Sequence, residues 1–443
     1  MSSATTSYNL HFSSITSGDL VDLPYHILQK LSILIFGLTT ISIKLPSILI
    51  GIALGFLLVL LLNRWFKSNV ALLASIISVL STPFLYLSST GTPLIMLVFW
   101  PTLLLWLGSK IQGEKRPNPI FCFIFAIALL LSVFTPHLIY LAVFIVVFAL
   151  IHPHLRFTIR NLPLIPLIIA SLIILGGLSI LTINAFSNHA VLKTILFSED
   201  FSFGNFFTNL KSAFVPFFSW NTTTESVYLS PLISLPSFFI AFSGLISTRK
   251  GFFASRNAIA SCLIFFTIIL SGFNPDSAIL LILPLSILIA HGLRYILEKW
   301  YNLFPENPYA RIFAIFPISL FIGIIIISDL SHYVYGYRYT PAVANNFSTD
   351  LSLISKNLPE NTYLLLEENS LEFNFFKIYE DKSHKITVVS ETPNDYNHLA
   401  TLGEPNEQLP TNSLTAIITS PKTDNSDRIY LYEKIIDEEN PSE

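Results

Sequence analysis

The sequence predicts an all-α polytopic membrane bundle of about ten transmembrane helices, followed by a small C-terminal α/β domain. Three observations favour this fold class. Only 12% of the 443 residues are charged, whereas about 25% is usual in soluble domains. Apolar runs long enough to cross a bilayer recur through the first three quarters of the chain. The last quarter is polar, with short segments of strand-like alternation.

The N-terminal segment, residues 1–45, is predicted to lie outside the membrane. Its second half begins with "DLPYHILQKLSILIFG" at residue 22, which has the spacing of an amphipathic helix lying in the membrane interface. Residues 1–21 have no basic stretch and no long apolar run, which argues against a signal peptide.

The predicted membrane body, residues 46–329, consists of apolar runs of nearly the roughly 20 residues that a bilayer core requires. Prolines inside several runs, such as Pro101 and Pro317, are compatible with packed helices that re-satisfy the freed carbonyls. The predicted spans are residues 46–63, 69–88, 92–109, 119–134, 137–151, 163–185, 231–248, 258–273, 278–297 and 311–329.

The connecting loops alternate in charge. Lys and Arg gather in residues 64–67, 110–116, 156–160, 249–256 and 294–311, whereas the alternate turns "SSTGT", "TPH" and "NPDS" contain neither. Because basic loops stay in the cytoplasm, the N-terminal segment, the long loop 186–230 and the tail are expected outside. The prediction is a multi-pass cell-membrane protein with an extracytoplasmic C-terminal domain.

The tail, residues 330–443, is acidic. It holds 8 basic against 18 acidic residues, whereas residues 1–329 hold 17 against 10. That sign does not suit nucleic acid or an anionic lipid surface as a partner of the tail. "TDLSLISKNLP" predicts a helix, and "TYLLLEEN", "KITVVSE", "LTAIITS" and "RIYLYEKII" predict strands. Its acids are scattered, so we expect a compact α/β unit that contributes no catalytic group.

Three consecutive stretches share a known pattern: "DLPYHILQKLSILIFG", "IKLPSILIG" and "NRWFKSNVALLASIISVLSTPFLYLSS". Across these stretches, an acid and a proline come first, then an amphipathic helix, then Leu-Pro-Ser at the start of an apolar run, and then a basic turn. This order over residues 22–109 resembles the GT-C superfamily of membrane glycosyltransferases, which includes bacterial lipid A aminoarabinose transferases and protein O-mannosyltransferases. "NPIFCFIFAIALLLSVFTPHLIYLAVFIVVFALI" and "LILPLSILIAHGLRYIL" are similar to later spans of the same family.

The resemblance implies transfer of a sugar from a polyprenyl-phosphate donor to an acceptor at the outer face. The partners are then the polyprenyl-phosphate-linked sugar and the lipid bilayer. Such enzymes carry a catalytic Asp where the chain enters the bilayer, which makes Asp22, with Asp19 beside it, the candidate base.

Weaker candidates for substrate binding lie in other predicted outer segments. His137 lies in the turn "FTPHL", Glu199 and Asp200 in the long loop, and Asp276 in "FNPDSA". Each has a structural alternative. Asp22 and Asp276 are placed to cap helices, His137 could be an interfacial side chain, and the loop acids could be solvated. The aromatic run at 201–220 favours an interfacial helix.

Departures from the family pattern keep a second function open. Tyr25 replaces the second proline, Leu94 an acid, Pro136 a lysine and Leu280 an arginine, and the family's first span has no counterpart. The chain is therefore interpreted as N-terminally truncated and divergent. The alternative is an inactive GT-C-like scaffold or lipid-binding protein. A transporter is disfavoured because the spans hold almost no ionisable residues and show no repeat.

No cofactor is predicted. The sequence has no phosphate-binding glycine loop, no dinucleotide fingerprint and no His/Cys spacing typical of a metal site, although the use of a divalent metal stays open. Cys122 and Cys262 lie in apolar runs, where they are expected to be small buried hydrophobes.

Overall fold

A computed structural model of the chain forms two compact units. The helical unit comprises His11–Tyr25 and Ser47–Val334, and the α/β unit comprises Met1–Leu10, His26–Pro46 and Tyr335–Glu443. The predicted N-terminal segment is therefore shared between the units. The structure describes all residues except 1, 11–19, 114–117, 161, 163, 188–193, 197–202, 219–232, 250–253, 304–307, 338–349, 369, 384, 394, 404–408, 410–412, 420–427 and 435–443.

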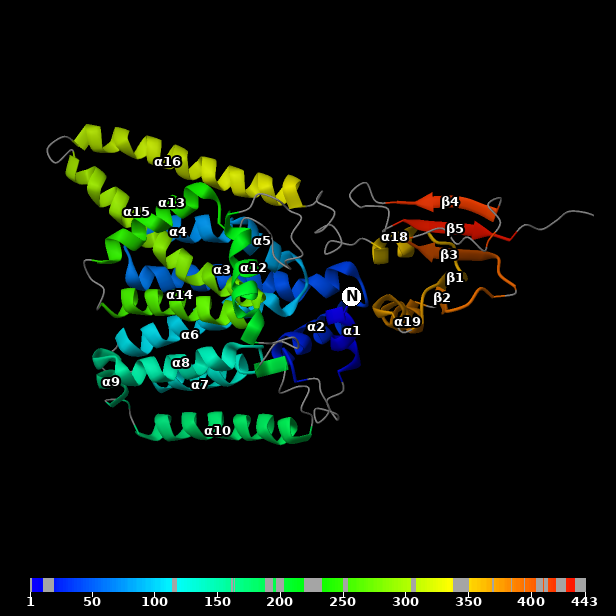
Figure 1. Ribbon diagram of the computed structural model, residues 1–443, viewed down its shortest axis with the longest axis horizontal. Coiled ribbons are helices and arrows are strands. Elements are labelled where there is room, and N and C mark those ends of the chain that lie inside the picture. Colours follow the sequence, from blue (N-terminus) through cyan, green and yellow to red (C-terminus); the bar gives the residue numbers. More distant parts are fainter. Residues whose placement is uncertain are drawn as a thin grey trace, which may run out of the picture. The chain divides into compact units, whose positions relative to one another are not determined.

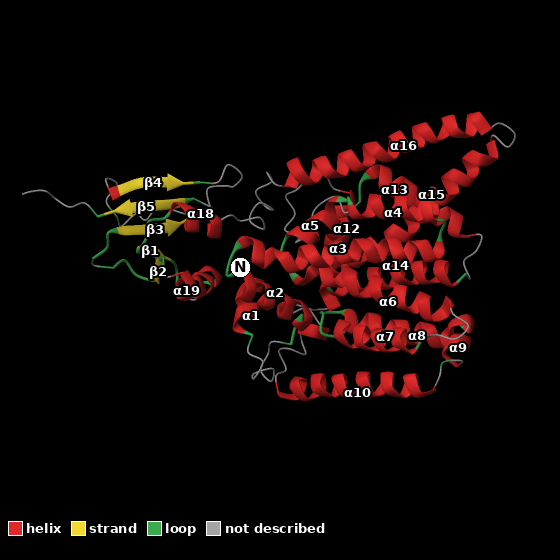
Figure 2. Cartoon of the chain, turned by 180° about the vertical axis from the view of Figure 1, so that it is seen from behind, coloured by secondary structure: helices red, strands yellow, loops and turns green. Residues whose placement is uncertain are grey.

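The helical unit is a bundle of long helices that run side by side (Figure 1). Helices α10 and α16 lie at opposite edges of this bundle, as both Figure 1 and Figure 2 show. Its elements are α3 (Thr40–Trp65), α4 (Ser68–Val79), α5 (Thr82–Ser89), η2 (Pro93–Ile95), α6 (Met96–Gly113), α7 (Pro119–Ser132), α8 (Leu138–Ile151), α9 (Pro153–Arg160), α10 (Leu164–Ser187), η3 (Phe203–Asn205), α12 (Phe206–Phe218), α13 (Leu235–Thr248), α14 (Ser255–Phe273), η5 (Pro275–Leu281), α15 (Ile282–Leu303), α16 (Pro308–Ser331) and the π-turn η6 (His332–Tyr337).

Each of the ten predicted apolar runs forms helix in its described residues, with a break after α4 in one of them, and the helices differ in length. Among the described residues, five helices are long and apolar enough to cross a membrane: Thr40–Trp65, Pro93–Gln112, Arg256–Phe273, Pro275–Asn302 and Phe316–Tyr335. Helices α4 and α5 would make a sixth span, bent by 61°. The other four runs form shorter apolar helices. The chain is thus a multi-pass membrane protein by length and composition, and the full count of ten stays a prediction.

Helices α13 and α15 pack closely because each presents a glycine to the other. A Cβ atom at Gly244 would lie 2.0 Å from the Leu288 carbonyl oxygen. A Cβ atom at Gly292 would lie 1.9 Å from the Ile240 carbonyl oxygen. Small residues let helix backbones approach in this way inside membranes, where close packing replaces the hydrophobic effect as the driving force.

An arginine ties α14 to the C-terminal end of α3. Arg256 Nη1 donates a hydrogen bond to the Trp65 carbonyl at 2.6 Å, and its guanidinium lies 5.5 Å from the centre of the Phe66 ring. A cation at this position satisfies a carbonyl that the end of a helix leaves unpaired. The contact joins two ends that the charge pattern predicts to be cytoplasmic.

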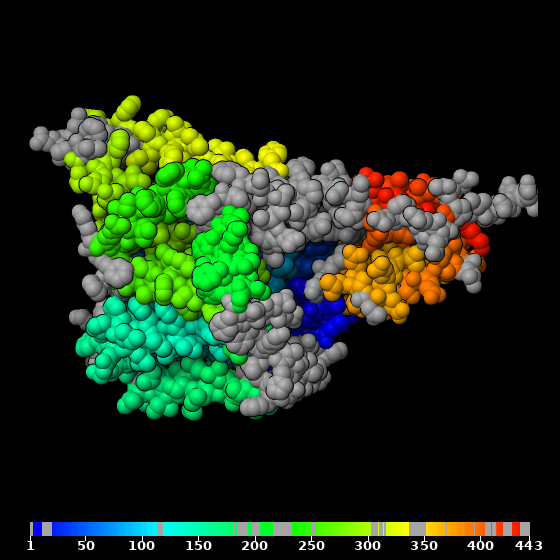
Figure 3. Space-filling model, in the orientation of Figure 1, coloured from blue at the N-terminus to red at the C-terminus, as the bar shows by residue number. Residues whose placement is uncertain are grey.

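Within the aromatic run, residues 206–218 form the helix α12, which lies crosswise to the long helices and on the surface of the helical unit (Figures 1 and 3). Its buried side packs on α14: Phe206 contacts the ring of Phe273 edge-on, and Ala213 is fully buried. Phe207 points outward with 78% of its surface exposed. An exposed aromatic side chain on a crosswise helix suits the predicted interfacial role.

The α/β unit contains a five-stranded sheet of order β2-β1-β3-β5-β4. Strand β1 pairs in parallel with β2 and β3, whereas β5 is antiparallel to β3 and β4. The predicted helix and four strands are confirmed, and α19 and β3 are additions. The elements are α1 (Ser2–Asn9), α2 (Leu23–Phe36, which starts in the helical unit), α18 (Asp350–Asn357), β1 (Thr362–Leu365), α19 (Leu371–Ser383), β2 (Ile386–Val389), β3 (His398–Leu402), β4 (Leu414–Ile418) and β5 (Ile429–Glu433).

Helix α2 has the opposite polarity to a helix on a soluble protein. His26 and Gln29 are buried, and the Ser7 hydroxyl of α1 lies 2.7 Å from His26 Nδ1 and 2.6 Å from Gln29 Oε1. Its outward side chains are apolar, with Leu34 61% and Ile35 71% exposed. A helix that buries its polar face and exposes its apolar face suits an environment of lipid, which supports the interfacial position predicted for this segment.

Candidate functional site

A cavity of about 390 Å³ opens in the helical unit where five parts of the chain meet. They are the residue before α2, the η2–α6 segment, the turn between α7 and α8, Thr194 of the long loop, and the start of η5. Its volume is within the range of small-molecule sites. The cavity is lined by Asp22, Pro93, Leu94, Leu97, Thr135, Pro136, His137, Thr194, Asn274 and Asp276.

Three of the six candidate residues therefore share one cavity. Asp22, His137 and Asp276 lie far apart in the sequence and meet in its lining. The other three, Asp19, Glu199 and Asp200, lie outside the described residues.

Asp22 is held by its backbone. Its N–H donates to the Phe134 carbonyl at the end of α7, at 2.9 Å, and its own carbonyl accepts from the Tyr25 N–H in the first turn of α2. Its φ of 52° is in the left-handed region, which costs energy for a residue other than glycine. The side chain is 8% exposed, and its Oδ1 atom has no hydrogen-bond partner among the described residues.

Burial raises the pKa of Asp22 to about 7, because a carboxylate loses its hydration there. The Thr135 side chain offsets part of this rise in pKa. Burial has the larger effect, so the pKa stays above the ordinary value of an aspartate. A carboxyl group with a pKa near 7 can both accept and release a proton at physiological pH.

His137 is fixed from two sides. Its backbone N–H donates to the Ile195 carbonyl at 3.0 Å. On the side chain, the Nε2 atom lies 2.9 Å from Asn274 Nδ2. Its φ is 64°, so two of the three described non-glycine residues with positive φ line this cavity. Burial lowers the pKa of His137 to about 4, so the imidazole is neutral at physiological pH.

Asn274 sets the direction of these hydrogen bonds. Its Oδ1 accepts from the Asp276 N–H at 2.9 Å, which caps η5 and turns the amide Nδ2 toward His137. Because Asn Nδ2 can only donate, His137 Nε2 is assigned as the acceptor and Nδ1 carries the proton. The cap is thus Asn274 and not Asp276, which corrects the capping role considered for Asp276. Asn before Pro was the sequence signal for this cap.

The charges in the lining are of one sign. Asp22 and Asp276 supply carboxyl groups, His137 is neutral, and no Lys or Arg lies among the described lining residues. In the described parts of the chain, no group of three or more His, Cys, Asp or Glu is placed to hold a metal ion. The arrangement offers a proton acceptor, an imidazole N–H donor and an apolar wall formed by Leu94 and Leu97.

Comparison with known proteins gives a family over part of the chain. Residues 24–182 match the family model described as dolichyl-phosphate-mannose-protein mannosyltransferase. No curated protein matches the chain at a significant level.

Two solved structures match the chain at low sequence identity. The first is the oligosaccharyltransferase of Archaeoglobus fulgidus, tethered with an acceptor peptide containing the NVT sequon, at a TM-score of 0.50 and 12% identity. The match covers 87% of this chain and 58% of that one, so the chain spans little more than half of its length. The second is ArnT from Cupriavidus metallidurans bound to undecaprenyl phosphate, at a TM-score of 0.49 and 13% identity, over 94% of this chain and 88% of that one. Taken together, the family match and the fold identify the chain as similar to the GT-C superfamily of membrane glycosyltransferases.

Proposed function

We propose that the chain is a membrane glycosyltransferase that moves a sugar from a polyprenyl-phosphate donor to an acceptor at the outer face. The observation that carries this proposal is the buried Asp22 carboxyl at the 390 Å³ cavity, with an unpartnered oxygen and a pKa of about 7. The description of the matching family, which names a dolichyl-phosphate-linked mannose donor, supports a lipid-linked substrate.

The chemistry follows from a carboxyl group of this kind. The acceptor hydroxyl oxygen attacks the anomeric carbon of the donor sugar while the bond from that carbon to the phosphate oxygen breaks. Asp22 takes the hydroxyl proton, and the electron pair of the broken bond leaves with the polyprenyl phosphate. A base whose pKa lies near the operating pH is the most effective for this step.

His137 and Asn274 have a positioning role in this proposal. The neutral His137 carries its proton on Nδ1, because Asn274 donates to Nε2. An imidazole N–H held in this way can donate a hydrogen bond to a phosphate oxygen without being consumed as an acid. The left-handed backbone at His137 and Asp22 brings both residues into the same lining.

The outer-face location rests on the charge pattern of the loops. The cavity residues belong to segments predicted to be outside: the N-terminal segment, the long loop, and the regions beside the turns "SSTGT", "TPH" and "NPDS", which contain no Lys or Arg. The α/β unit is expected on the same side. The exposed apolar face of α2 and the exposed Phe207 of α12 would then meet the outer leaflet.

The test is sugar transfer from a polyprenyl-phosphate donor by the purified protein and its Asp22→Asn variant. Removal of a general base typically lowers the rate about 10²–10⁴-fold. Donor binding, measured in parallel, should change little. Glu298→Gln is the matched control, since Glu298 is exposed and pairs with Arg294 far along α15. Full activity in Asp22→Asn would exclude Asp22 from the reaction.

One observation favours the alternative of an inactive, lipid-binding scaffold. No Lys or Arg lines the described part of the cavity, so the charge that grows on a departing phosphate has no cationic partner there. A scaffold of this kind would bind the polyprenyl-phosphate donor and fail to transfer its sugar. The same experiment separates the two functions, because wild-type binding without transfer would establish the scaffold.

A further inference from the structure

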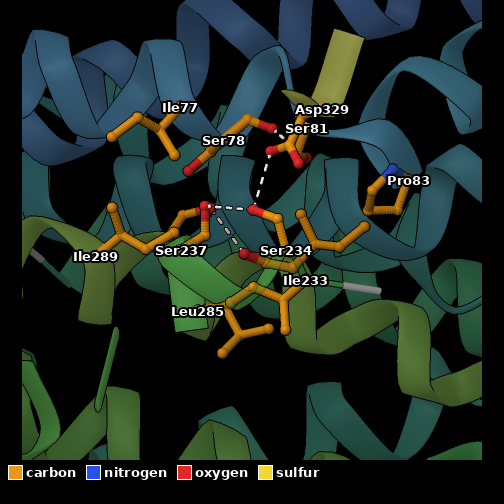
Figure 4. Close-up of a pocket in the computed structure, with 12 residues that line it drawn as sticks. Ile77, Ser78, Ser81, Pro83, Ile233, Ser234, Ser237, Leu285, Ile289 and Asp329 are labelled. Carbon is orange, nitrogen blue, oxygen red and sulfur yellow. Dashed lines mark hydrogen bonds between the residues drawn. The ribbon is translucent and has the colours of Figure 1, made fainter. Parts of the chain in front are cut away.

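A second cavity lies in the interior of the helical unit and shares no lining residue with the first. Its volume is about 30 Å³, which holds one water-sized particle. Five serines and one aspartate contribute the polar groups, and no Lys, Arg or His lies among the described lining residues (Figure 4). The lining consists of Ile77, Ser78, Ser81, Pro83, Ile233, Ser234, Ser237, Ile282, Leu285, Ser286, Ile289 and Asp329.

Asp329 is an acid inside an apolar helix. It belongs to α16, within the candidate span Phe316–Tyr335, and only 6% of its surface is exposed. Its Oδ2 atom lies 3.3 Å from the Ser234 hydroxyl, and its main-chain carbonyl accepts from Thr82 Oγ1 at 3.0 Å. No Lys, Arg or His in the described chain forms an ion pair with it. A carboxyl group at such a place needs either a proton or a cation.

The serine hydroxyls in the lining present oxygen lone pairs. Ser78 donates its hydrogen to the Ala74 carbonyl at 2.9 Å, Ser81 to the Ser78 carbonyl at 2.6 Å, and Ser286 to the Ile282 carbonyl at 2.7 Å. Because a hydroxyl has one hydrogen, these three oxygens can only accept or ligate toward the cavity. Ser234 donates as well, toward Asp329 or Ser237. The cavity is therefore rich in acceptors and poor in donors.

We propose that this cavity binds one dehydrated monovalent cation, Na⁺, through the Asp329 carboxylate and the surrounding serine hydroxyl oxygens. Hard oxygen ligands suit such a cation. One carboxylate with neutral oxygens balances a single charge, whereas divalent cations usually take more carboxylates or retained waters. The volume admits the ion without its hydration shell.

The site is built from several helices of the bundle. Ser78 and Ser81 lie at the 61° break between α4 and α5, Ser234 and Ser237 at the start of α13, and Asp329 on α16. Figure 4 shows Ser234 between Ser237 and Asp329, with dashed hydrogen bonds linking them. Breaks in membrane helices commonly supply oxygen ligands to Na⁺. Bound Na⁺ would fasten α16 to the bundle and raise the stability of the folded state by linkage.

The test is the melting temperature of the purified full chain in detergent, titrated with NaCl against choline chloride at constant ionic strength. We expect a saturable rise of a few degrees with Na⁺ and a smaller rise with K⁺. The Asp329→Asn variant should lose the rise. Glu298→Gln, an exposed acid on α15, should keep it.

A second variant guards against a fold defect in Asp329→Asn. Ser286→Ala keeps the charge and removes one ligand oxygen, so we expect the half-saturating Na⁺ concentration to rise about tenfold. Equal melting temperatures in Na⁺ and choline would overturn the proposal and leave Asp329 protonated. Two other results would also overturn the proposal. One is a melting temperature that rises without saturation and equally for Na⁺ and K⁺; the other is a Na⁺-dependent rise that remains in Asp329→Asn.

Discussion

Asp22 combines burial, a left-handed backbone and a carboxylate oxygen that has no hydrogen-bond partner among the described residues. Each costs folding free energy, and none adds to the packing of α2. Strain and unpaired polar groups of this kind concentrate at functional sites, because the surrounding structure holds residues there against their preference. At the scale of single residues, the case for a reactive cavity rests on this combination.

The pH dependence of transfer should follow Asp22. Because the base acts only when ionised, kcat/KM is expected to rise with pH and to reach half its maximum near pH 7, the pKa of the buried carboxyl. The ionisation of His137 should not change kcat/KM above pH 5, because burial lowers the pKa of His137 to about 4. The measurement is the pH–rate profile of the wild type. A profile that is flat from pH 6 to pH 8 would contradict this assignment.

The same raised pKa predicts a stability effect of definite sign. Between the ordinary pKa of an aspartate and about 7, Asp22 is protonated when folded and ionised when unfolded. Unfolding then releases a proton, so raising the pH through this window lowers the free energy of unfolding. Asparagine does not ionise, so the free energy of unfolding of the Asp22→Asn variant should not fall in this way. Its melting temperature should therefore exceed that of the wild type more at pH 8 than at pH 4, and the opposite trend would refute the burial argument.

At the scale of secondary-structure elements, the contact between α13 and α15 depends on two glycines. An alanine at Gly292 would place a methyl group 1.9 Å from the Ile240 carbonyl oxygen, a backbone atom that cannot move aside alone. We expect Gly292→Ala to separate the helices and destabilise the fold by about 1–3 kcal/mol. Gly323→Ala on α16 is the matched control, because no atom lies within 4 Å of its added Cβ. Equal melting temperatures for the two variants would contradict the close packing.

Tyr25 shows how an element can compensate for a departure from a family pattern. It stands where the resemblance noted in the sequence implies a second proline. Its hydroxyl is buried 2.7 Å from Ser47 Oγ, and Ser47 in turn donates to the Thr92 carbonyl at 3.2 Å. The start of α2 is thereby linked to α3 and to η2, beside the cavity wall. These hydrogen bonds hold the chain in place here, much as the fixed backbone angle of a proline would.

At the scale of the whole molecule, the predicted topology can be tested by labelling. In a background in which Cys122 and Cys262 are replaced by alanine, single cysteines at positions 115 and 250 should resist an impermeant thiol reagent in intact cells. A cysteine in the acidic tail should react. The reason is the alternation of basic and uncharged loops, which sets orientation during insertion. Labelling at 115 or 250, or none in the tail, would reverse the orientation.

The core of the α/β unit joins both ends of the chain. Ala4 and Ile33 share one hydrophobic cluster with Leu364 and Phe376. Phe376 is fully buried, so Phe376→Ala should cost about 3–5 kcal/mol and melt this unit at a lower temperature.

Transfer by the remaining folded protein should persist, because no group of this unit belongs to the described cavity lining. Loss of transfer from Phe376→Ala protein whose helical unit is still folded would show that the α/β unit takes part in the reaction.

The sequence by itself determined the membrane class, the helical nature of every apolar run and the helix and four strands of the tail. These features are local, since they follow from apolar runs, alternation and turn residues within short windows. It also pointed to Asp22, because acid and proline before an amphipathic helix form a contiguous pattern. The addition β3 escaped prediction because its three central residues are all buried, so no alternation marks it.

Only the tertiary structure decided which residues meet. Asp22, His137 and Asn274 lie in segments more than 100 residues apart, and no local pattern pairs them. The same holds for Asp329, which shares its cavity with five serines from α4, the break after α4, the start of α13 and α15. Burial, and with it the pKa of Asp22 and the need of Asp329 for a counter-charge, depends on the surroundings that distant segments supply. Desolvation is a property of the packed molecule, so its consequences for chemistry could be reached only through the fold.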